Sequence, residues 1–217
     1  MDARVIPPKT PRRATPRRTN EERSAETRGR LIEATIACLN RVGYAGTTTL
    51  LVNEKSGVTR GGLLHHFPSK VDLLIATAEA CLEKMREERR RRSAKGEGPA
   101  GLIAVERGRH GIALTEIMLG SRSDKELARR FKPVGEVILQ AQRIAARNIA
   151  ERAGITDDLH QVEVNVWLTM GAIRGMTLME LAGVDSGLTE EALKLMDGNS
   201  RAMNRKLRGD KPKPAKS

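Results

Sequence analysis

The sequence predicts an all-α protein, and three observations support this fold class. Aromatic residues make up only 2% of the 217 residues, whereas strands favour aromatic and β-branched side chains. Apolar residues recur at helical spacings of three and four, and no alternating run is long enough to require a strand. The longest stretch without a charged side chain, residues 42–53, is far shorter than the roughly 20 apolar residues of a membrane-spanning helix. We therefore expect a soluble helical protein with no membrane partner.

The positive charge is concentrated at the two ends of the chain. The formal net charge is +12 and the pI is near 10.3, which indicates a polyanionic partner, either nucleic acid or an acidic membrane surface. Residues 1–20 carry six basic side chains against one acidic, and residues 205–217 carry the same excess. Residues 21–80 carry seven of each sign. Because both ends also contain prolines and little to bury, we predict a disordered basic arm at 1–20 and a disordered basic tail at 205–217.

The sequence favours a cytoplasmic location. The N-terminus is charged with no apolar segment behind it, so we expect no secretory signal. The two cysteines, Cys38 and Cys81, fall inside apolar helical patterns and cannot form the disulfide framework of a small secreted fold. We interpret both as small core residues.

The first predicted helix covers residues 20–42, and Gly43 terminates it. Its apolar stripe consists of Leu31, Thr35, Cys38, Leu39 and Val42. Two short helices follow: Thr48 is a suitable N-cap for one at 49–56, and Thr59 for another at 59–67. Gly57 breaks the chain between them. Two short helices joined by a three-residue turn containing glycine form a helix-turn-helix.

A helix at residues 69–92 follows this motif, and residues 96–101, rich in glycine, mark the clearest internal boundary. The remaining helices are predicted at 102–119, at 125–152 with Pro133 as a start or kink, at 158–181 and at 189–207. The sequence thus predicts a small helical domain followed by a larger one.

The second helix of the motif contains two adjacent glycines, each of which costs roughly 1 kcal/mol relative to alanine in a helix interior. One explanation is a close approach to the major groove of DNA, with Arg60 and His65 reaching base edges. The other is close packing inside the domain. Either explanation suits Gly61, and for Gly62 we favour groove contact.

Around this motif the sequence resembles the TetR family of transcriptional regulators. The resemblance covers the N-terminal quarter to third of the chain and rests on Gly43, Tyr44, Thr47, Thr48, Gly57, Val58, Thr59, Gly61, Leu63, His66, Phe67, Ser69, Lys70 and Leu73. It implies that the first domain binds operator DNA, and that a variable C-terminal helical domain dimerises and binds a small-molecule inducer.

Transferred residue by residue, the resemblance implies base-facing positions at Arg60, Gly62 and His65, and phosphate contacts at Thr48, Thr49, His66 and Lys70. Phe67 is interpreted as core. The sequence departs from the family at Leu64, where many relatives carry a phosphate-binding Tyr, and at Leu51, where many carry an acidic residue. Both departures bear on detailed contacts and on the operator sequence.

The resemblance places an inducer pocket among the middle helices, which are rich in methionine. Methionine suits an adaptable pocket, although it also simply fills core gaps. The predicted lining consists of Met118, Phe131, Ile138, Asn148, Trp167 and Met170, with Asn148 or His110 as the polar anchor.

A dimer face is predicted on the last two helices. Gly171 and Gly175 allow two helices to approach closely, either between subunits or within the chain. The predicted interface consists of Leu168, Gly171, Gly175, Leu178, Met196, Ser200 and Met203. Its heptad-like spacing in the last helix is typical of helix pairing.

These patterns favour a homodimeric, ligand-responsive repressor that binds a palindromic double-stranded operator. We divide the chain into an arm at 1–20, a helix-turn-helix domain at 21–73, an effector-binding and dimerisation domain at 74–204 and a tail at 205–217. The histidines lack metal-site spacing and no catalytic motif is present, so we expect no enzyme activity, cofactor or metal. The alternatives are a sequence-independent DNA-organising protein and a helical small-molecule receptor without DNA binding.

Overall fold

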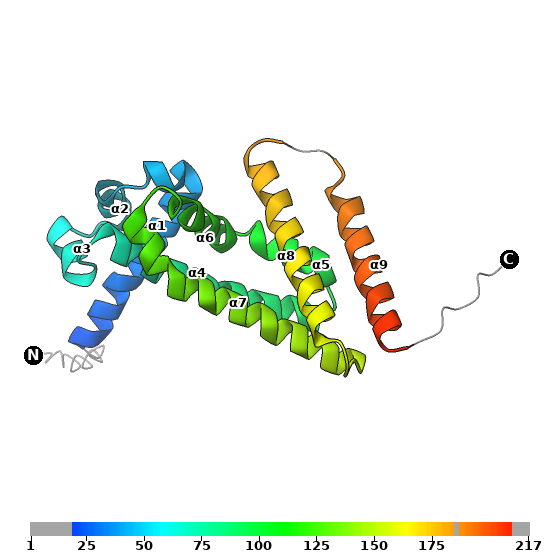
Figure 1. Ribbon diagram of the computed structural model, residues 1–217. Helices are drawn as coiled ribbons and strands as arrows, with labels where there is room; N and C mark the ends of the chain where they lie inside the picture. Colours follow the sequence, from blue (N-terminus) through cyan, green and yellow to red (C-terminus); the bar gives the residue numbers. More distant parts are fainter. Residues whose placement is uncertain (1–18, 185–186, 210–217) are drawn as a thin grey trace, which may run out of the picture.

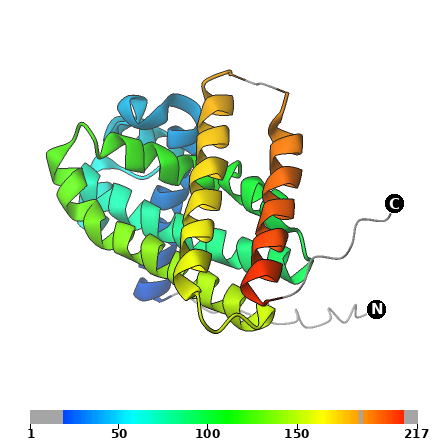
Figure 2. The same cartoon turned by 45° about the vertical axis from the view of Figure 1, so that its right-hand side comes forward.

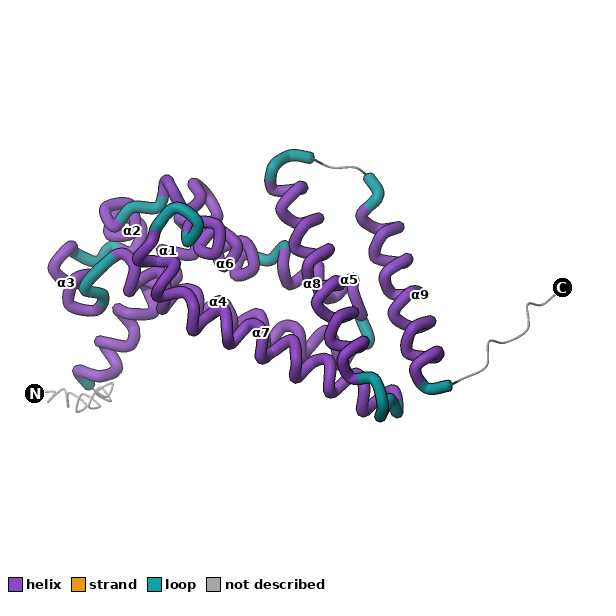
Figure 3. Tube along the Cα trace, viewed as in Figure 1, coloured by secondary structure: helices purple, strands orange, loops and turns teal. Residues whose placement is uncertain are grey.

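The computed structural model describes residues 19–184 and 187–209 (Figure 1), and within them every regular element is an α-helix (Figure 3). The all-α prediction is confirmed for this part of the chain. The helices are α1 (Asn20–Gly46), α2 (Thr49–Ser56), α3 (Arg60–His66), α4 (Lys70–Ala94), α5 (Gly98–Glu106), α6 (Arg109–Gly120), α7 (Lys125–Ala153), α8 (Leu159–Leu181) and α9 (Thr189–Leu207).

α1 begins at Asn20, as predicted, and continues beyond the predicted end to Gly46, with a non-helical residue at Gly43. Thr19 and Glu22 form a capping box, in which each side chain accepts a hydrogen bond from the other residue's amide. Thr19 and Asn20 therefore belong to the first helix rather than to the arm. Residues 1–18 of the predicted arm and 210–217 of the predicted tail lie outside the described residues. Val42, expected on the buried stripe, is exposed, and α1 kinks directly after it at Gly43, where φ is +65°.

The single helix predicted at 102–119 is two helices. Gly108 takes an extended conformation between α5 and α6, and a side chain at Gly111 would collide with the Glu106 carbonyl. The chain therefore leaves the helical conformation at Gly108, and the start of α6 packs closely against the end of α5. α5 also begins inside the predicted boundary at 96–101. Pro133 neither starts nor ends a helix, because α7 runs through it.

Two hydrophobic cores meet on α4, one helix shared by both parts of the molecule. Leu73 and Ala76 pack with the core of α1 to α3, which is centred on Leu63 and Phe67. Leu74, Ile75, Ala78, Cys81, Leu82 and Met85 pack instead against α6 and α7. Cys38 and Cys81 are both fully buried free cysteines, as their apolar surroundings predicted. Burial raises the pKa of the Cys81 thiol to about 12.

A third core joins the end of α7 to the start of α8, and comprises Ala146, Ala150, Ile155, Val162 and Val166. α9 stands beside α8 and α5 (Figure 2) and contains no buried residue. α4 and α7 thus contribute residues to the buried cores, whereas α9 contributes no buried residue.

Candidate nucleic-acid interface and effector cleft

The helix-turn-helix is formed by α2 and α3, and each of these helices is capped by a side chain. Thr48 and Thr59 each accept a hydrogen bond of 3.2 Å from the amide three residues later. Gly57 has φ +66°, a conformation that side-chain-bearing residues rarely adopt, and so permits the tight turn. Arg30 of α1 donates to the Ser56 carbonyl at 2.5 Å and fastens the end of α2.

One side of α3 packs against the domain core, and the other side is exposed to solvent. Leu63 is 1% exposed and Phe67, directly after the helix, is 2% exposed, so the interpretation of Phe67 as core is confirmed. The Arg28 guanidinium lies 4.5 Å from the centre of the Phe67 ring. Arg60 and His65, predicted to face bases, are exposed. The anchoring therefore leaves these two side chains on the surface of a fixed helix.

The two glycines of α3 differ in their surroundings. A Cβ atom at Gly62 would lie 2.9 Å from Val58 Cγ1 and 3.3 Å from Thr59 Oγ1, whereas one at Gly61 would meet nothing within 4 Å. Packing inside the chain thus accounts for Gly62, whereas among the described residues no neighbouring side chain or other element accounts for Gly61. Packing is therefore the explanation that the structure supports for Gly62, and close approach to DNA at Gly61 stays a prediction. Base contact by Gly62 itself stays a prediction.

The four predicted phosphate contacts all sit at helix ends of the motif. Thr48 caps α2, Thr49 begins it, His66 ends α3 and Lys70 begins α4. Thr48 is exposed, while the other three are half-buried. Helix starts offer unpaired amides and a positive dipole end, which favour an anion. Their role as phosphate contacts stays a prediction.

Lys70 lies close to two residues outside α2 and α3, namely Tyr44 of α1 and Asp124, the N-cap residue of α7. Its ammonium lies 4.6 Å from the centre of the Tyr44 ring. Burial lowers the pKa of Lys70, and the Asp124 carboxylate opposes that shift. The Tyr44 hydroxyl donates to Asp124 Oδ2 at 2.9 Å, and its amide donates to Glu116 at 2.7 Å. Burial and the bond to Asp124 raise the pKa of Tyr44 to about 12.

A second bridge joins α4 to α7. The Arg130 guanidinium donates to Asp72 Oδ1 at 2.8 Å, and the Ser69 hydroxyl donates to Asp72 Oδ2 at 2.7 Å. These bonds, that from Ser69 first, lower the pKa of Asp72. Sequence reasoning missed both bridges, because their partners lie 58 and 80 positions apart and no local pattern links them.

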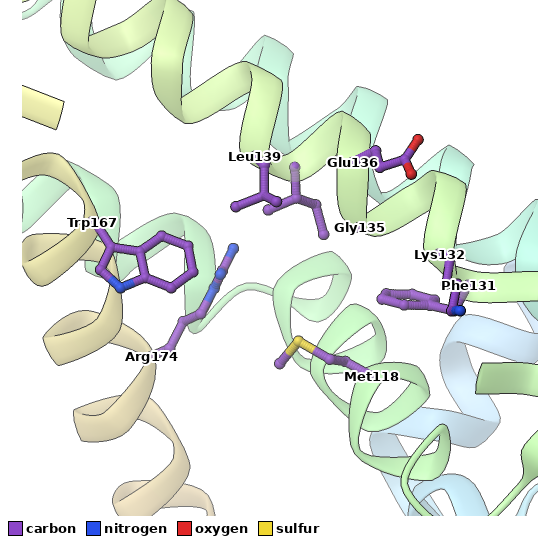
Figure 4. Close-up of a pocket in the computed structure, with 9 residues that line it drawn as sticks. Met118, Phe131, Lys132, Gly135, Glu136, Leu139, Trp167 and Arg174 are labelled. Carbon is purple, nitrogen blue, oxygen red and sulfur yellow. The ribbon is translucent and has the colours of Figure 1, made fainter. Parts of the chain in front are cut away.

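A cleft of about 410 Å³ lies between α6, α7 and α8 (Figure 4). Four of the residues predicted to contact an effector line it: Met118, Phe131, Ile138 and Trp167. The lining also includes Lys132, Gly135, Glu136, Leu139 and Arg174, which sequence reasoning missed. Charged side chains on a helix usually mark a solvated face. The sequence alone therefore gives no sign that these charged residues line a cleft.

The other three predicted pocket residues do not line this cleft. Asn148 is exposed and lies ten positions beyond Ile138, or roughly 15 Å further along α7. Met170 is buried. His110 is half-buried near Arg109 and Glu33, and burial and Arg109 lower its pKa. Neither proposed polar anchor therefore reaches the cleft, where the polar groups are Lys132, Glu136 and Arg174.

The α8 part of the predicted dimer face points outward. Leu168 and Leu178 are exposed, and added Cβ atoms at Gly171 and Gly175 would meet nothing within 4 Å. The α9 part differs: Met196, Ser200 and Met203 are half-buried, and Asn165 of α8 donates to Ser200 Oγ at 3.2 Å. Ser200 thus contacts its own chain. The glycines of α8 are not explained by packing inside the protomer.

In residues 19–184 and 187–209, no cluster of three or more His, Cys, Asp or Glu side chains could hold a metal ion. No helix in that part of the chain is both long and apolar enough to cross a membrane.

Comparisons with known proteins agree on one family. Residues 31–77 match the model for bacterial regulatory proteins of the tetR family. CymR of Pseudomonas putida, an HTH-type transcriptional regulator, is 47% identical over 79 residues, which are 36% of this chain and 39% of that protein. The repressor KstR of Rhodococcus jostii strain RHA1 is 28% identical over 159 residues, which are 66% of this chain and 70% of that one. The match with CymR thus spans about two fifths of that relative's length.

Solved structures share the helical fold over most of the chain. Salmonella enterica GusR has a TM-score of 0.58 and 21% identity, with 85% of this chain and 96% of that chain covered. A transcriptional regulator from Rhodococcus sp. Rha1 has a TM-score of 0.61 and 18% identity, with 82% and 96% covered.

The residues that match the tetR family model form the second half of α1, all of α2 and α3, and the start of α4. The relatives are named as transcriptional regulators, not as enzymes. Residues 31–77, which include the helix-turn-helix, are thus similar to the tetR family of bacterial regulatory proteins.

Proposed function

We propose that this protein is a homodimeric, cytoplasmic repressor that binds a palindromic operator and is released by a small-molecule effector. The observation that carries DNA reading is the outward face of α3. Arg60 and His65 are exposed there, and an added Cβ at Gly61 would meet nothing within 4 Å beyond its own helix backbone in the part of the chain that the structure describes. A helix anchored by Leu63 can therefore approach the floor of a major groove.

Dimerisation is supported by the exposed face of α8. Leu168, Leu178, Gly171 and Gly175 lie on a surface that one protomer leaves open. Exposed glycines let a second helix approach closely, and exposed leucines supply apolar area to bury. A two-fold axis through this face would present two copies of α3 separated by about 34 to 36 Å, or a multiple of that spacing.

Effector release requires a link between the cleft and α3, and α7 supplies one. Phe131 lines the cleft, and the adjacent Arg130 holds Asp72 at the start of α4. Asp124, at the start of the same helix, holds Tyr44 near Lys70. An effector that binds one position of α7 better than the other would shift the arrangement of the DNA-binding segment through its differential affinity.

DNA binding is tested by fluorescence anisotropy with DNA from upstream of the protein's own gene and with a random duplex, over a range of salt concentrations. We expect preference for the upstream duplex at about 150 mM salt, and a loss of about 1 to 3 kcal/mol for Arg60→Ala or His65→Ala. Equal binding of both duplexes with a steep salt dependence would instead support a DNA-organising protein. No binding would support a receptor.

Effector coupling is tested with Arg130→Gln and Tyr44→Phe. Each variant removes one bridge and leaves the cleft lining intact. We expect operator binding to persist while release by an effector weakens. Release as efficient as in the unmodified protein in both variants would show that the signal takes another route.

A further inference from the structure

A buried charge cluster lies behind the cleft. The Glu106 side chain, at the end of α5, is 2% exposed. Its Oε1 lies 2.5 Å from Arg89 Nη2, and its Oε2 lies 3.6 Å from Arg174 Nε. One buried carboxylate thus faces two guanidinium groups, each of whose side chains is 23% exposed. The cluster carries one positive charge more than it balances.

Arg174 places this excess positive charge in the lining of the cleft. It is the only member of the cluster in the cleft lining, and Figure 4 shows it extending from α8 beside Trp167. A distance of 3.6 Å makes an ion pair but exceeds the roughly 2.7 to 2.9 Å of a charge-assisted hydrogen bond. Glu106 therefore orients Arg174 without exhausting a guanidinium group that has five N–H donors.

The other walls of the cleft are mostly apolar. They are formed by Met118, Phe131, Ile138, Leu139 and Trp167, together with Gly135. Lys132 and Glu136 contribute one charge of each sign and cancel in sum. The volume of about 410 Å³ lies within the range of small-molecule sites. The cleft thus combines an apolar body with a single net cation, which Arg174 provides.

We propose that the effector is an amphipathic carboxylate, with its anionic group on Arg174 and its apolar body between Trp167 and Phe131. This inference rests on the proposed function of the cleft as the effector site. A carboxylate neutralises the uncompensated positive charge in a wall of low polarity, where a charge interacts more strongly than in water. A neutral ligand leaves that charge unpaired, and a cationic ligand is repelled by it.

The test uses the fluorescence of Trp167, which is the only tryptophan in the sequence. Decanoate is compared with 1-decanol and decylamine, which share its apolar chain. We expect decanoate to bind at least about tenfold more tightly than 1-decanol, as one hydrogen bond to a charged group would give. Decylamine should bind the weakest of the three. Equal affinity for decanoate and 1-decanol, or no response to decanoate, would overturn the assignment.

Three variants locate the anion. Arg174→Gln should abolish the preference for decanoate, while Arg174→Lys should retain part of it. Lys132→Gln, which removes the other cation of the cleft, serves as the matched control and should change affinity less than about twofold. A retained preference in Arg174→Gln, or a full loss in Lys132→Gln, would overturn the role of Arg174. Thermal melting checks that each variant remains folded.

Operator binding separates this inference from the proposed function. If decanoate binds at Trp167 but does not weaken operator binding by the unmodified protein, the anion site stands and the effector role of the cleft fails. If 1-decanol releases DNA as well as decanoate does, the effector role stands and the anion assignment fails.

Discussion

The segment from α1 to α4 and the segment from α7 to α9 differ in helix capping and in how fully they bury their apolar side chains. In the first, α1, α2, α3 and α4 are each capped by a Thr or Ser side chain, and its core buries Leu63 and Phe67 almost fully. In the second, Asp side chains cap α7 and α8, but α9 has no side-chain cap and no buried residue. Among the described residues, fifteen large apolar side chains are exposed, three before residue 100 and twelve after it. The first segment buries most of its large apolar side chains within one chain. The second exposes many of them, on a surface that another molecule could cover.

The sharpest contrast is expected from the core of the first segment. Phe67→Ala should lower the free energy of unfolding by about 3 to 5 kcal/mol, because it leaves a cavity beneath α3. Leu64→Ala, on the exposed side of α3, should change it by no more than about 0.5 kcal/mol. Urea unfolding followed by circular dichroism measures both. Similar losses in the two variants would mean that α3 is not anchored as described.

The exposed face of α8 should show the opposite behaviour. Leu168→Asp should weaken dimerisation by roughly 2 kcal/mol, or about thirtyfold in Kd, because a charge would have to be buried between subunits. Sedimentation velocity should then show a species near the 23.8 kDa of one chain. Leu50→Asp, equally exposed but on α2, should leave the dimer intact. A dimer that survives Leu168→Asp would place the interface elsewhere.

The two glycines of α3 should separate stability from DNA binding. Gly61→Ala should keep stability, or raise it by up to roughly 1 kcal/mol through helix propensity, yet weaken operator binding by about 1 to 3 kcal/mol. Gly62→Ala should destabilise the fold by about 1 to 3 kcal/mol, because its Cβ would press on Val58. Melting curves and anisotropy report the two effects. Unchanged operator affinity in Gly61→Ala would contradict the close approach of α3 to DNA.

The smallest effect concerns the bridge between the two segments. The pKa of Asp72 is lowered by Ser69 and Arg130, so its stabilising contribution is complete above the ordinary Asp pKa of about 3.9 and is lost as the pH falls through the lower folded-state pKa. Melting temperatures of the unmodified protein and Asp72→Asn should therefore converge below about pH 4. Arg130→Gln should reduce this pH dependence only in part, because Ser69 still donates. A constant difference between pH 6 and pH 3 would rule the bridge out.

Local chemistry explains how much the sequence could predict. Gly57, Thr48 and Thr59 encode turn and caps within a few residues, so the helix-turn-helix was predicted closely, as was α9. The break between α5 and α6 was missed, because it depends on how Gly111 packs on the Glu106 backbone. Arg174 and Lys132 were missed in the cleft, because charged positions on a helix resemble a solvated face. Asn148 was placed there wrongly, since one sequence does not show how far along α7 the cleft extends.

The adjacency of Arg130 and Phe131 constrains how this chain can change length during evolution. Successive residues on a helix point about 100° apart. A single-residue insertion between Asp124 and Arg130 would therefore rotate everything after it on α7, Arg130 and Phe131 included, relative to the contact of Asp124 with Tyr44. Substitutions along the cleft can alter which molecule is recognised without moving these contacts. Descendants of this gene should therefore diverge in their ligands through point substitution, while the length of this part of α7 stays invariant.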